Sequence, residues 1–177
     1  MIVAFHLLIG WLIADLISGI VHWIEDRILW VGMPLISKSV VEPNRLHHED
    51  PRFFLDQTIW QRGGTTWFAT AALAGLWLWL IGFSFIWLSA LAGGLLTAEI
   101  HAMAHRGNET TGFPRVLQQI GIIQSPSHHA GHHSRAMDTR YCTLTDFLNP
   151  LLDWIGVWPA LEKILTTIGL EPNRGTQ

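Results

Sequence analysis

The chain has 177 residues, of which 49% are hydrophobic and only 14% are charged, with a formal net charge of −3 at pH 7. Soluble globular domains carry about 25% charged residues, so this composition argues against a soluble enzyme, a disordered tail or a coiled-coil rod. The slightly acidic balance offers no basic surface, and we therefore expect no nucleic-acid partner. The single cysteine, Cys142, excludes an internal disulfide framework and a cysteine-rich zinc module. The length leaves room for one domain over 1–177, and the composition indicates a membrane protein.

Apolar runs predict three membrane-spanning helices. The first, near 2–24, is long enough to cross a hydrocarbon core of roughly 30 Å at about 1.5 Å per residue. No basic segment precedes it and no small-residue cleavage site follows it, so we expect a retained helix rather than a signal peptide. A second apolar block, from Thr65 to Ala104, is about twice the length of one span. Because 82–84 near its middle reads Gly-Phe-Ser, we predict two antiparallel helices near 65–82 and 84–105 joined by a tight turn.

The positive charges predict the orientation of the chain. All eleven Lys and Arg residues lie in 25–64 or after 105. With three spans, both basic regions lie on one side of the membrane, and the positive-inside rule makes that side the cytoplasm. We therefore expect the N-terminus outside and the C-terminus inside. Two further segments, near 113–123 and 147–170 with a break at Pro159, are predicted to form cytoplasmic helices in the interfacial plane.

Histidine is the most informative residue type, with ten copies in the chain. Nine of them lie in the predicted cytoplasmic half or just beyond the cytoplasmic end of a span: His22, His47, His48, His101, His105, His128, His129, His132 and His133. Residues four apart, such as His101 and His105, differ by only about 40° around a helix and leave one face. Imidazole binds Fe, Cu, Ni and Zn, and a catalytic zinc takes about three protein ligands. Eight or more convergent histidines therefore fit two metal ions better than one zinc or a pH-sensing surface cluster.

Five motifs occur in order between residues 11 and 170. They are D-x-x-S-G-x-x-H-W-x-x-D from Asp15 to Asp26, H-H-x-D-P from His47 to Pro51, H-x-x-x-H from His101 to His105, H-x-x-H-H from His129 to His133, and Tyr141-Cys142 followed by Leu148-Asn149. In this combination the chain resembles the lipid desaturase domain family. That family includes plasmanylethanolamine desaturases, which form the vinyl ether of plasmalogens, and a plastid desaturase of phosphatidylglycerol acyl chains.

The resemblance implies an all-α integral membrane protein with its histidine cluster at the cytoplasmic face. It implies a non-haem di-iron centre, with two irons per chain and O2 as co-substrate, that introduces a double bond into a membrane lipid chain. The best candidate substrate is the alkyl ether chain of plasmanylethanolamine. The implied iron ligands are His22, His47, His48, His101, His105, His129, His132 and His133. Because the sequence shows no haem, flavin or iron–sulfur domain, electrons would come from a separate carrier of the cytochrome b5 or ferredoxin type.

Two carboxylates are further candidates for the catalytic site. Asp15, His22 and Asp26 fall within roughly 40° of one another on a helix and form one polar stripe. Asp15 lies mid-span, where an ionisable group is costly, so it is either functional or a hydrogen-bonding link between helices. Asp26 is interpreted as a ligand or as the partner that fixes an imidazole tautomer. Helical geometry alone does not decide the role of His128, because it forms an i, i+4 pair with His132. The resemblance implies that His128 lies outside the ligand set, because H-x-x-H-H is the recurring motif of the family and the position before it varies.

Other functions fit the sequence less well. A zinc protease would need H-E-x-x-H, whereas residues 101–105 read H-A-M-A-H. A metal transporter would place its ligands at mid-bilayer on several spans. An acyl desaturase acting on phosphatidylglycerol or another phospholipid, and a di-iron membrane hydroxylase, remain open alternatives because the same iron chemistry serves all three.

Overall fold

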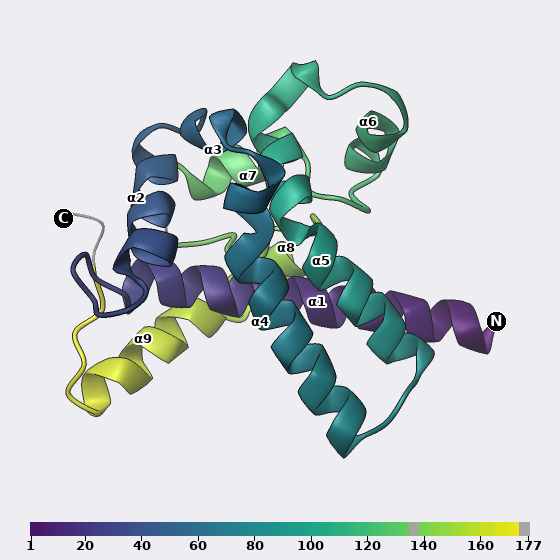
Figure 1. Ribbon diagram of the computed structural model, residues 1–177, viewed down its shortest axis with the longest axis horizontal. Coiled ribbons are helices and arrows are strands. Elements are labelled where there is room, and N and C mark those ends of the chain that lie inside the picture. Colours follow the sequence, from purple (N-terminus) through teal and green to yellow (C-terminus); the bar gives the residue numbers. More distant parts are fainter. Residues whose placement is uncertain (135–137, 174–177) are drawn as a thin grey trace.

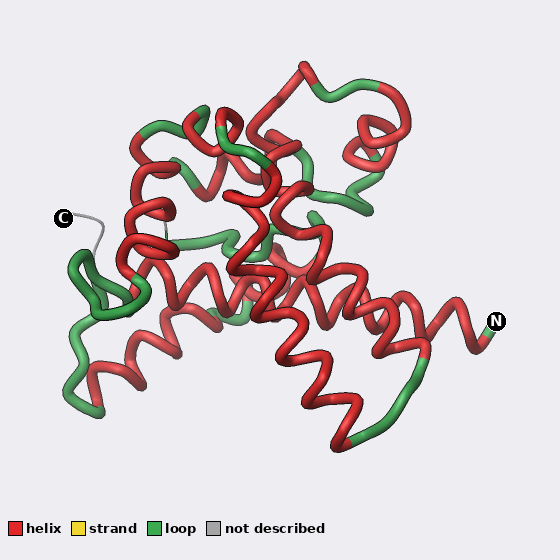
Figure 2. The backbone as a smooth tube through the Cα atoms, viewed as in Figure 1, coloured by secondary structure: helices red, strands yellow, loops and turns green. Residues whose placement is uncertain are grey.

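The computed structural model describes residues 1–134 and 138–173, and every regular element within them is helical (Figures 1 and 2). Three long helices are α1 (Ile2–Arg27), α4 (Ile59–Leu80) and α5 (Phe85–Arg106). The shorter elements are the π-helix η1 (Ser37–Val41), α2 (Glu42–Glu49), α3 (Phe53–Asp56), the 3-10 helix η2 (Gly107–Glu109), α6 (Gly112–Gln119), α7 (Pro126–His132), α8 (Leu148–Trp154) and α9 (Val157–Thr167). The all-α prediction is therefore confirmed.

Two helices within the described residues are long and apolar enough to cross a membrane. They are α1 and the continuous segment Phe85–Glu109, which contains α5 and η2. The helix predicted near 65–82 is present as α4, but it begins at Ile59 because Thr58 and Gln61 form a capping box at its start. Because of this cap, the polar residues Gln61 and Arg62 lie in the first turn of α4. Helix α4 is not one of the two candidate membrane-spanning helices. A third span therefore remains a prediction.

Small residues bring α1 and α5 into close contact. A Cβ atom on Gly10 would lie 2.2 Å from the carbonyl oxygen of Ile86, and one on Gly93 would lie 2.6 Å from the Cβ of Ala14. Ser89 of α5 also donates a hydrogen bond of 2.7 Å to the carbonyl of Leu7 on α1. Such small-residue contacts are typical of helices that pack in membranes. They fix the two helices that carry three of the predicted metal ligands, His22, His101 and His105.

The turn predicted at 82–84 lies between α4 and α5. Gly82 adopts a φ of 91°, which favours glycine, and Ser84 caps α5 by accepting a hydrogen bond from the amide of Trp87. Figure 1 shows that α4 and α5 diverge toward this turn. Near the diverging ends, the indole Nε1 of Trp87 donates to the carbonyl of Ala74 on α4 at 2.8 Å. This hydrogen bond links the two helices across the gap between them.

The C-terminal part of the chain packs against the C-terminal end of α1. Helices occupy the segments predicted near 113–123 and 147–170, but the break in the second lies at Gly156, with a φ of 71°, rather than at Pro159. Pro159 lies in the first turn of α9, where a missing amide hydrogen breaks no helical hydrogen bond. Trp158 packs in a buried cluster with Trp23 and Tyr141, which fixes the 138–145 segment beside α1.

Candidate metal centre

The eight predicted ligand histidines and Asp26 gather in two adjoining groups. The five-histidine group contains His47, His101, His105, His129 and His133, and the aspartate group contains His22, Asp26, His48 and His132. Within each group the nearest nitrogen or oxygen atoms all lie within 4.8 Å of one another. Residues carried by α1, α2, α5 and α7, from position 22 to position 133 of the sequence, therefore converge on one place.

Nitrogen spacing in the five-histidine group fits a bound metal ion. The Nε2 atom of His129 lies 2.9 Å from that of His101, 2.9 Å from that of His105 and 3.0 Å from that of His133. Imidazole nitrogens lie about 2.1 Å from a metal ion, so two of them at right angles are about 3.0 Å apart. Four nitrogens aimed at one another at this spacing could bind one metal ion together.

The aspartate group is centred on the carboxylate of Asp26. Its Oδ1 lies 3.0 Å from His48 Nε2, and its Oδ2 lies 3.2 Å from His132 Nε2 and 3.7 Å from His22 Nε2. Asn44 donates a hydrogen bond of 2.8 Å to Oδ1 and so orients the carboxylate. Asp26 is thus placed to be a ligand or to hold three imidazoles in position.

The two groups share their supporting elements and touch each other. In α2, His47 belongs to one group and His48 to the other, and their ring centroids are 4.2 Å apart. The rings of His48 and His133 are 4.8 Å apart. Pro43 lies in the first turn of α2, while Ser125 caps α7 by accepting a hydrogen bond from the amide of His128, so both short helices have defined starts. Two neighbouring metal ions fit this arrangement.

Backbone carbonyls fix the orientation of three of the imidazoles. The Nδ1 of His22 lies 3.1 Å from the carbonyl of Tyr141, that of His47 lies 2.6 Å from the carbonyl of Asn44, and that of His132 lies 2.7 Å from the carbonyl of Thr139. A carbonyl only accepts, so each Nδ1 carries the proton and each Nε2 keeps a free lone pair. Such outer hydrogen bonds are typical of metal-bound histidine.

Electrostatics keep the imidazoles of His47, His129 and His133 neutral. Burial and the neighbouring histidines lower the pKa of His47 and His129 well below the usual value, and the same causes lower that of His133 to about 2. A histidine must be neutral to bind a metal. These three side chains therefore present lone pairs at any physiological pH.

Asp15 lies outside both groups and is fully buried. Its carboxylate accepts hydrogen bonds from the amides of Leu144 and Thr145, each at 3.0 Å, and from the Thr145 hydroxyl. Ser18 adds a bond of 3.1 Å from the amide of Thr143. These contacts favour the structural alternative for Asp15: it anchors the segment whose Tyr141 carbonyl orients His22.

Two other histidines lie apart from the groups. His128 is partly buried, and its ring belongs to neither group. Its backbone carbonyl accepts a hydrogen bond from Arg140. His6 lies near the opposite end of α1. The structure thus separates His128 from its neighbour His129, as expected.

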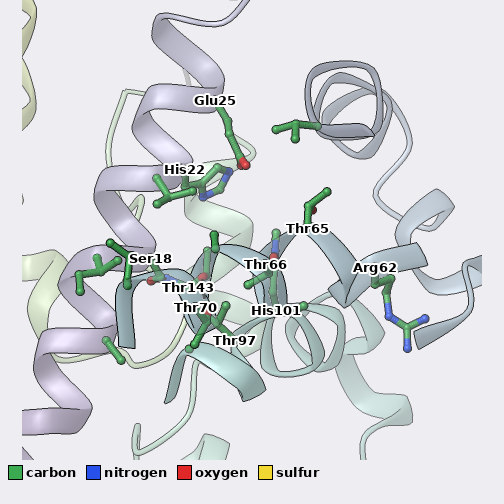
Figure 3. Close-up of a pocket in the computed structure, with 18 of the residues that line it drawn as sticks. Ser18, His22, Glu25, Arg62, Thr65, Thr66, Thr70, Thr97, His101 and Thr143 are labelled. Carbon is green, nitrogen blue, oxygen red and sulfur yellow. Dashed lines mark hydrogen bonds between the residues drawn. The ribbon is translucent and has the colours of Figure 1, made fainter. Parts of the chain in front are cut away.

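A cavity of about 300 Å³ adjoins the metal centre and lies among α1, α4 and α5. Its lining includes His22, His47 and His101 at one end, and Trp77 and Trp87 at the other. Hydroxyl groups line part of the wall between them: Ser18, Thr65, Thr66, Thr70, Thr97 and Thr143 (Figure 3). Histidines therefore face an elongated space whose exposed lining is mainly apolar.

Glu25 is a residue that the sequence interpretation missed. It precedes Asp26, but its side chain lines the cavity, and Figure 3 shows it projecting from α1 near His22. Its position next to Asp26 in the sequence was the signal that could have indicated a second carboxylate near the site. The Thr139 and Tyr141 carbonyls could not be found this way, because any residue type supplies a backbone carbonyl.

The fold and the site define a helical protein with two adjoining, histidine-rich groups that could hold metal ions, at the end of an elongated cavity. Residues 11–175 match the lipid desaturase domain, and the chain belongs to this family. The resemblance noted in the motifs is thereby confirmed.

Curated relatives carry desaturase names. The chain is 27% identical to a plasmanylethanolamine desaturase of Myxococcus xanthus, over 94% of this chain and 62% of that protein. It is 30% identical to a probable fatty acid desaturase of Acanthamoeba polyphaga mimivirus, over 94% and 84% respectively. It is 28% identical to mouse plasmanylethanolamine desaturase 1, over 88% and 62%. The chain thus spans less than two thirds of both plasmanylethanolamine desaturases. No solved structure matches it significantly.

Proposed function

We propose that the protein is an O2-dependent desaturase that uses two iron ions to introduce a double bond into a membrane lipid chain. The observation that carries this proposal is the pair of nitrogen-rich ligand groups at one end of an elongated, mainly apolar cavity. Family membership gives the reaction type, and the nitrogen spacing supports a metal in the five-histidine group.

The ligand set suits iron in chemical terms. The five-histidine group would hold one ion, and His22, Asp26, His48 and His132 would hold the second. Imidazole and carboxylate ligands suit iron, and the single cysteine, Cys142, is buried elsewhere. When bound, an iron pair supplies the oxidising power that removes two hydrogen atoms from adjacent carbons. O2 is reduced to two waters with those hydrogens, two protons and two electrons from a cytochrome b5- or ferredoxin-type donor.

The residues of the chain have separable tasks in this reaction. His22, His47 and His101 belong to the metal groups and also line the cavity, so a chain in the cavity passes next to both groups. Alanine, leucine and tryptophan side chains along the helices exclude water from that chain. Asp26 holds its three imidazoles in position, and Asp15 anchors the 143–145 segment behind them.

We assign the alkyl ether chain of plasmanylethanolamine as the first candidate substrate. Two of the relatives carry that substrate in their names. Other relatives are named fatty acid desaturases, which supports an acyl chain of phosphatidylglycerol or another phospholipid as the second candidate. A hydroxylase is the third, because the same centre can return oxygen to the carbon.

One lipid experiment separates these outcomes. The chain is expressed in a host that lacks this activity, alkyl and acyl lipids are supplied, and the lipids are compared by mass with those of an empty-vector host. Loss of two hydrogens from the ether chain supports the first candidate, and loss from an acyl chain supports the second. Gain of one oxygen identifies a hydroxylase. One stoichiometric zinc and no iron in the purified protein would contradict the di-iron proposal.

We also propose that α4 is a third span, with the N-terminus outside and the metal centre at the cytoplasmic face. The one-sided placement of Lys and Arg supports this orientation. Cysteines introduced at Lys38 and at Arg115 should then be labelled from the same side of the membrane. Labelling from opposite sides would contradict the three-span topology.

A further inference from the structure

The end of the cavity remote from the metal centre is lined by two tryptophans. Trp77 of α4 and Trp87 of α5 lie near the turn that joins the two helices. His101 lies about four helical turns from Trp87 along α5, which corresponds to about 20 Å. One leaflet of a bilayer contributes about 15 Å of hydrocarbon. The cavity is therefore about as long as one chain of a membrane lipid.

Polarity sets the direction in which a chain would enter. The lining near the histidines includes Glu25, Asn44 and Arg62, which can face a headgroup, whereas the remote end includes Leu73 and Ala74. A lipid that keeps its headgroup among polar side chains must send its methyl end toward the tryptophans. The last carbons of the chain would then meet the indole rings.

The two indoles are held differently. Trp87 donates to the Ala74 carbonyl at 2.8 Å, and its ring lies 5.7 Å from that of Phe83. The Nε1 of Trp77 is buried and has no hydrogen-bond partner among the described residues. Trp87 therefore both bridges α4 and α5 and closes space between them, while Trp77 contributes bulk alone. This difference makes Trp77 the cleaner position for a substitution.

We propose that Trp77 and Trp87 form the floor of the cavity and set the longest lipid chain that the enzyme accepts. The inference rests on the proposed function, in that the cavity is taken to hold the substrate chain. A chain with more carbons than the cavity accommodates would have to displace an indole or withdraw its reacting carbons from the metal centre. One methylene in an apolar pocket typically changes discrimination by about 10-fold or more.

The test measures chain-length preference in the full-length protein in membranes. A mixture of lipids with one headgroup and chains of increasing length is supplied, and the ratio of longer-chain to shorter-chain product is determined within each variant. Trp77→Ala should raise this ratio about 10-fold or more for chains just beyond the wild-type limit. Ala74→Phe, which adds bulk one turn closer to the histidines, should lower it. A ratio within one preparation does not depend on the amount of folded enzyme.

Two control variants isolate the cause. Trp79→Ala removes an indole that is 80% exposed and does not line the cavity, so the ratio should not move. Trp87→Phe loses the hydrogen bond to the Ala74 carbonyl but keeps an aromatic ring at this position. The longest chain that the enzyme accepts should therefore change less than in Trp77→Ala. An unchanged ratio in both Trp77→Ala and Ala74→Phe, with product still formed, would overturn the inference.

A binding readout separates this inference from the proposed function. The chain lengths of lipids that copurify with wild type and with Trp77→Ala are compared by mass, without metal or turnover. A shift to longer chains in Trp77→Ala supports the proposal that the tryptophans limit chain length, even if the wild type makes no desaturated product. In that case only the proposed desaturase function would be contradicted. If the wild type makes no desaturated product and the chain-length distribution is also unchanged in Trp77→Ala, the proposal that the tryptophans limit chain length is overturned as well.

Discussion

The five-histidine group and the aspartate group share α2 and α7 but are held in place by different means. The histidines of α5 leave one face of a long helix, and their Nε2 atoms meet that of His129 at about 3 Å. In the aspartate group, a carboxylate faces three imidazoles, two of which take their orientation from carbonyls of the 138–145 segment. One site is therefore organised by helix packing, whereas the other depends on a segment fastened to α1 by Asp15 and Ser18.

The largest expected effect tests the five-histidine group. His129→Ala removes the nitrogen that lies about 3 Å from three other histidines, so it should abolish desaturation and lower the metal content of the purified protein. His128→Ala is the matched control, because His128 is adjacent in sequence and outside both groups. Its activity should fall by about 10–100-fold at most, the usual cost of a residue outside the ligand set. Equal and complete loss in both variants would contradict the grouping.

Asp26→Asn tests whether the aspartate group is a separate metal site. The amide keeps the shape of the side chain but removes the charge and places hydrogens against His132 or His48. We expect metal content to fall from about two ions per chain to about one, with desaturation lost. If both ions were retained, Asp26 would only position the imidazoles.

Asp15→Asn should distinguish the two groups by a smaller, indirect effect. The buried carboxylate accepts three hydrogen bonds from the 144–145 segment, so loss of its charge should cost about 2–3 kcal/mol of stability. Metal in the aspartate group should be bound about 10-fold more weakly or worse, while the five-histidine group is less affected. Thermal unfolding and metal titration check this prediction. Unchanged unfolding with lost activity would instead indicate a catalytic role for Asp15.

The smallest expected effect is the pH dependence of the metal-free protein. Burial lowers the pKa of His47, His129 and His133 below the ordinary 6.5, so the unfolded chain binds more protons than the folded chain at acidic pH. Stability should be fully present above about pH 6.5 and should fall as the pH drops below that value. Unfolding measured across pH 5–8 after chelation tests this. A constant midpoint would mean that these imidazoles are not buried without metal.

Much of the architecture could be predicted because it follows from periodicity. Apolar runs located the three long helices, and 100° per residue placed His22 and Asp26 on one face of α1 and His101 and His105 on one face of α5. The eight histidines converge as the motifs predicted; their role as iron ligands stays a prediction.

Other features depend on contacts between distant segments and left no local signal. Neither the Thr139 and Tyr141 carbonyls beside the imidazoles nor the link from Asp15 to Thr145 can be found from residue types. The start of α4 at Ile59 depends on a cap between Thr58 and Gln61, which apolar periodicity does not detect. The cavity is a product of three helices together, so it appears only when they are packed.

The link between Asp15 and the 143–145 segment has a consequence for synthesis of the protein. Leu144 lies 129 residues after Asp15, so the ribosome must make most of the chain before the carboxylate meets its amide partners. At about 5–20 residues per second, α1 spends on the order of 10 s with an unpaired carboxylate after it has emerged. Until residues 138–145 have been made, the carbonyls that orient His22 and His132 in the aspartate group do not exist. A nascent chain stalled before residue 138 would therefore carry all eight histidines of the two groups, but it would lack the segment that orients two imidazoles of the aspartate group.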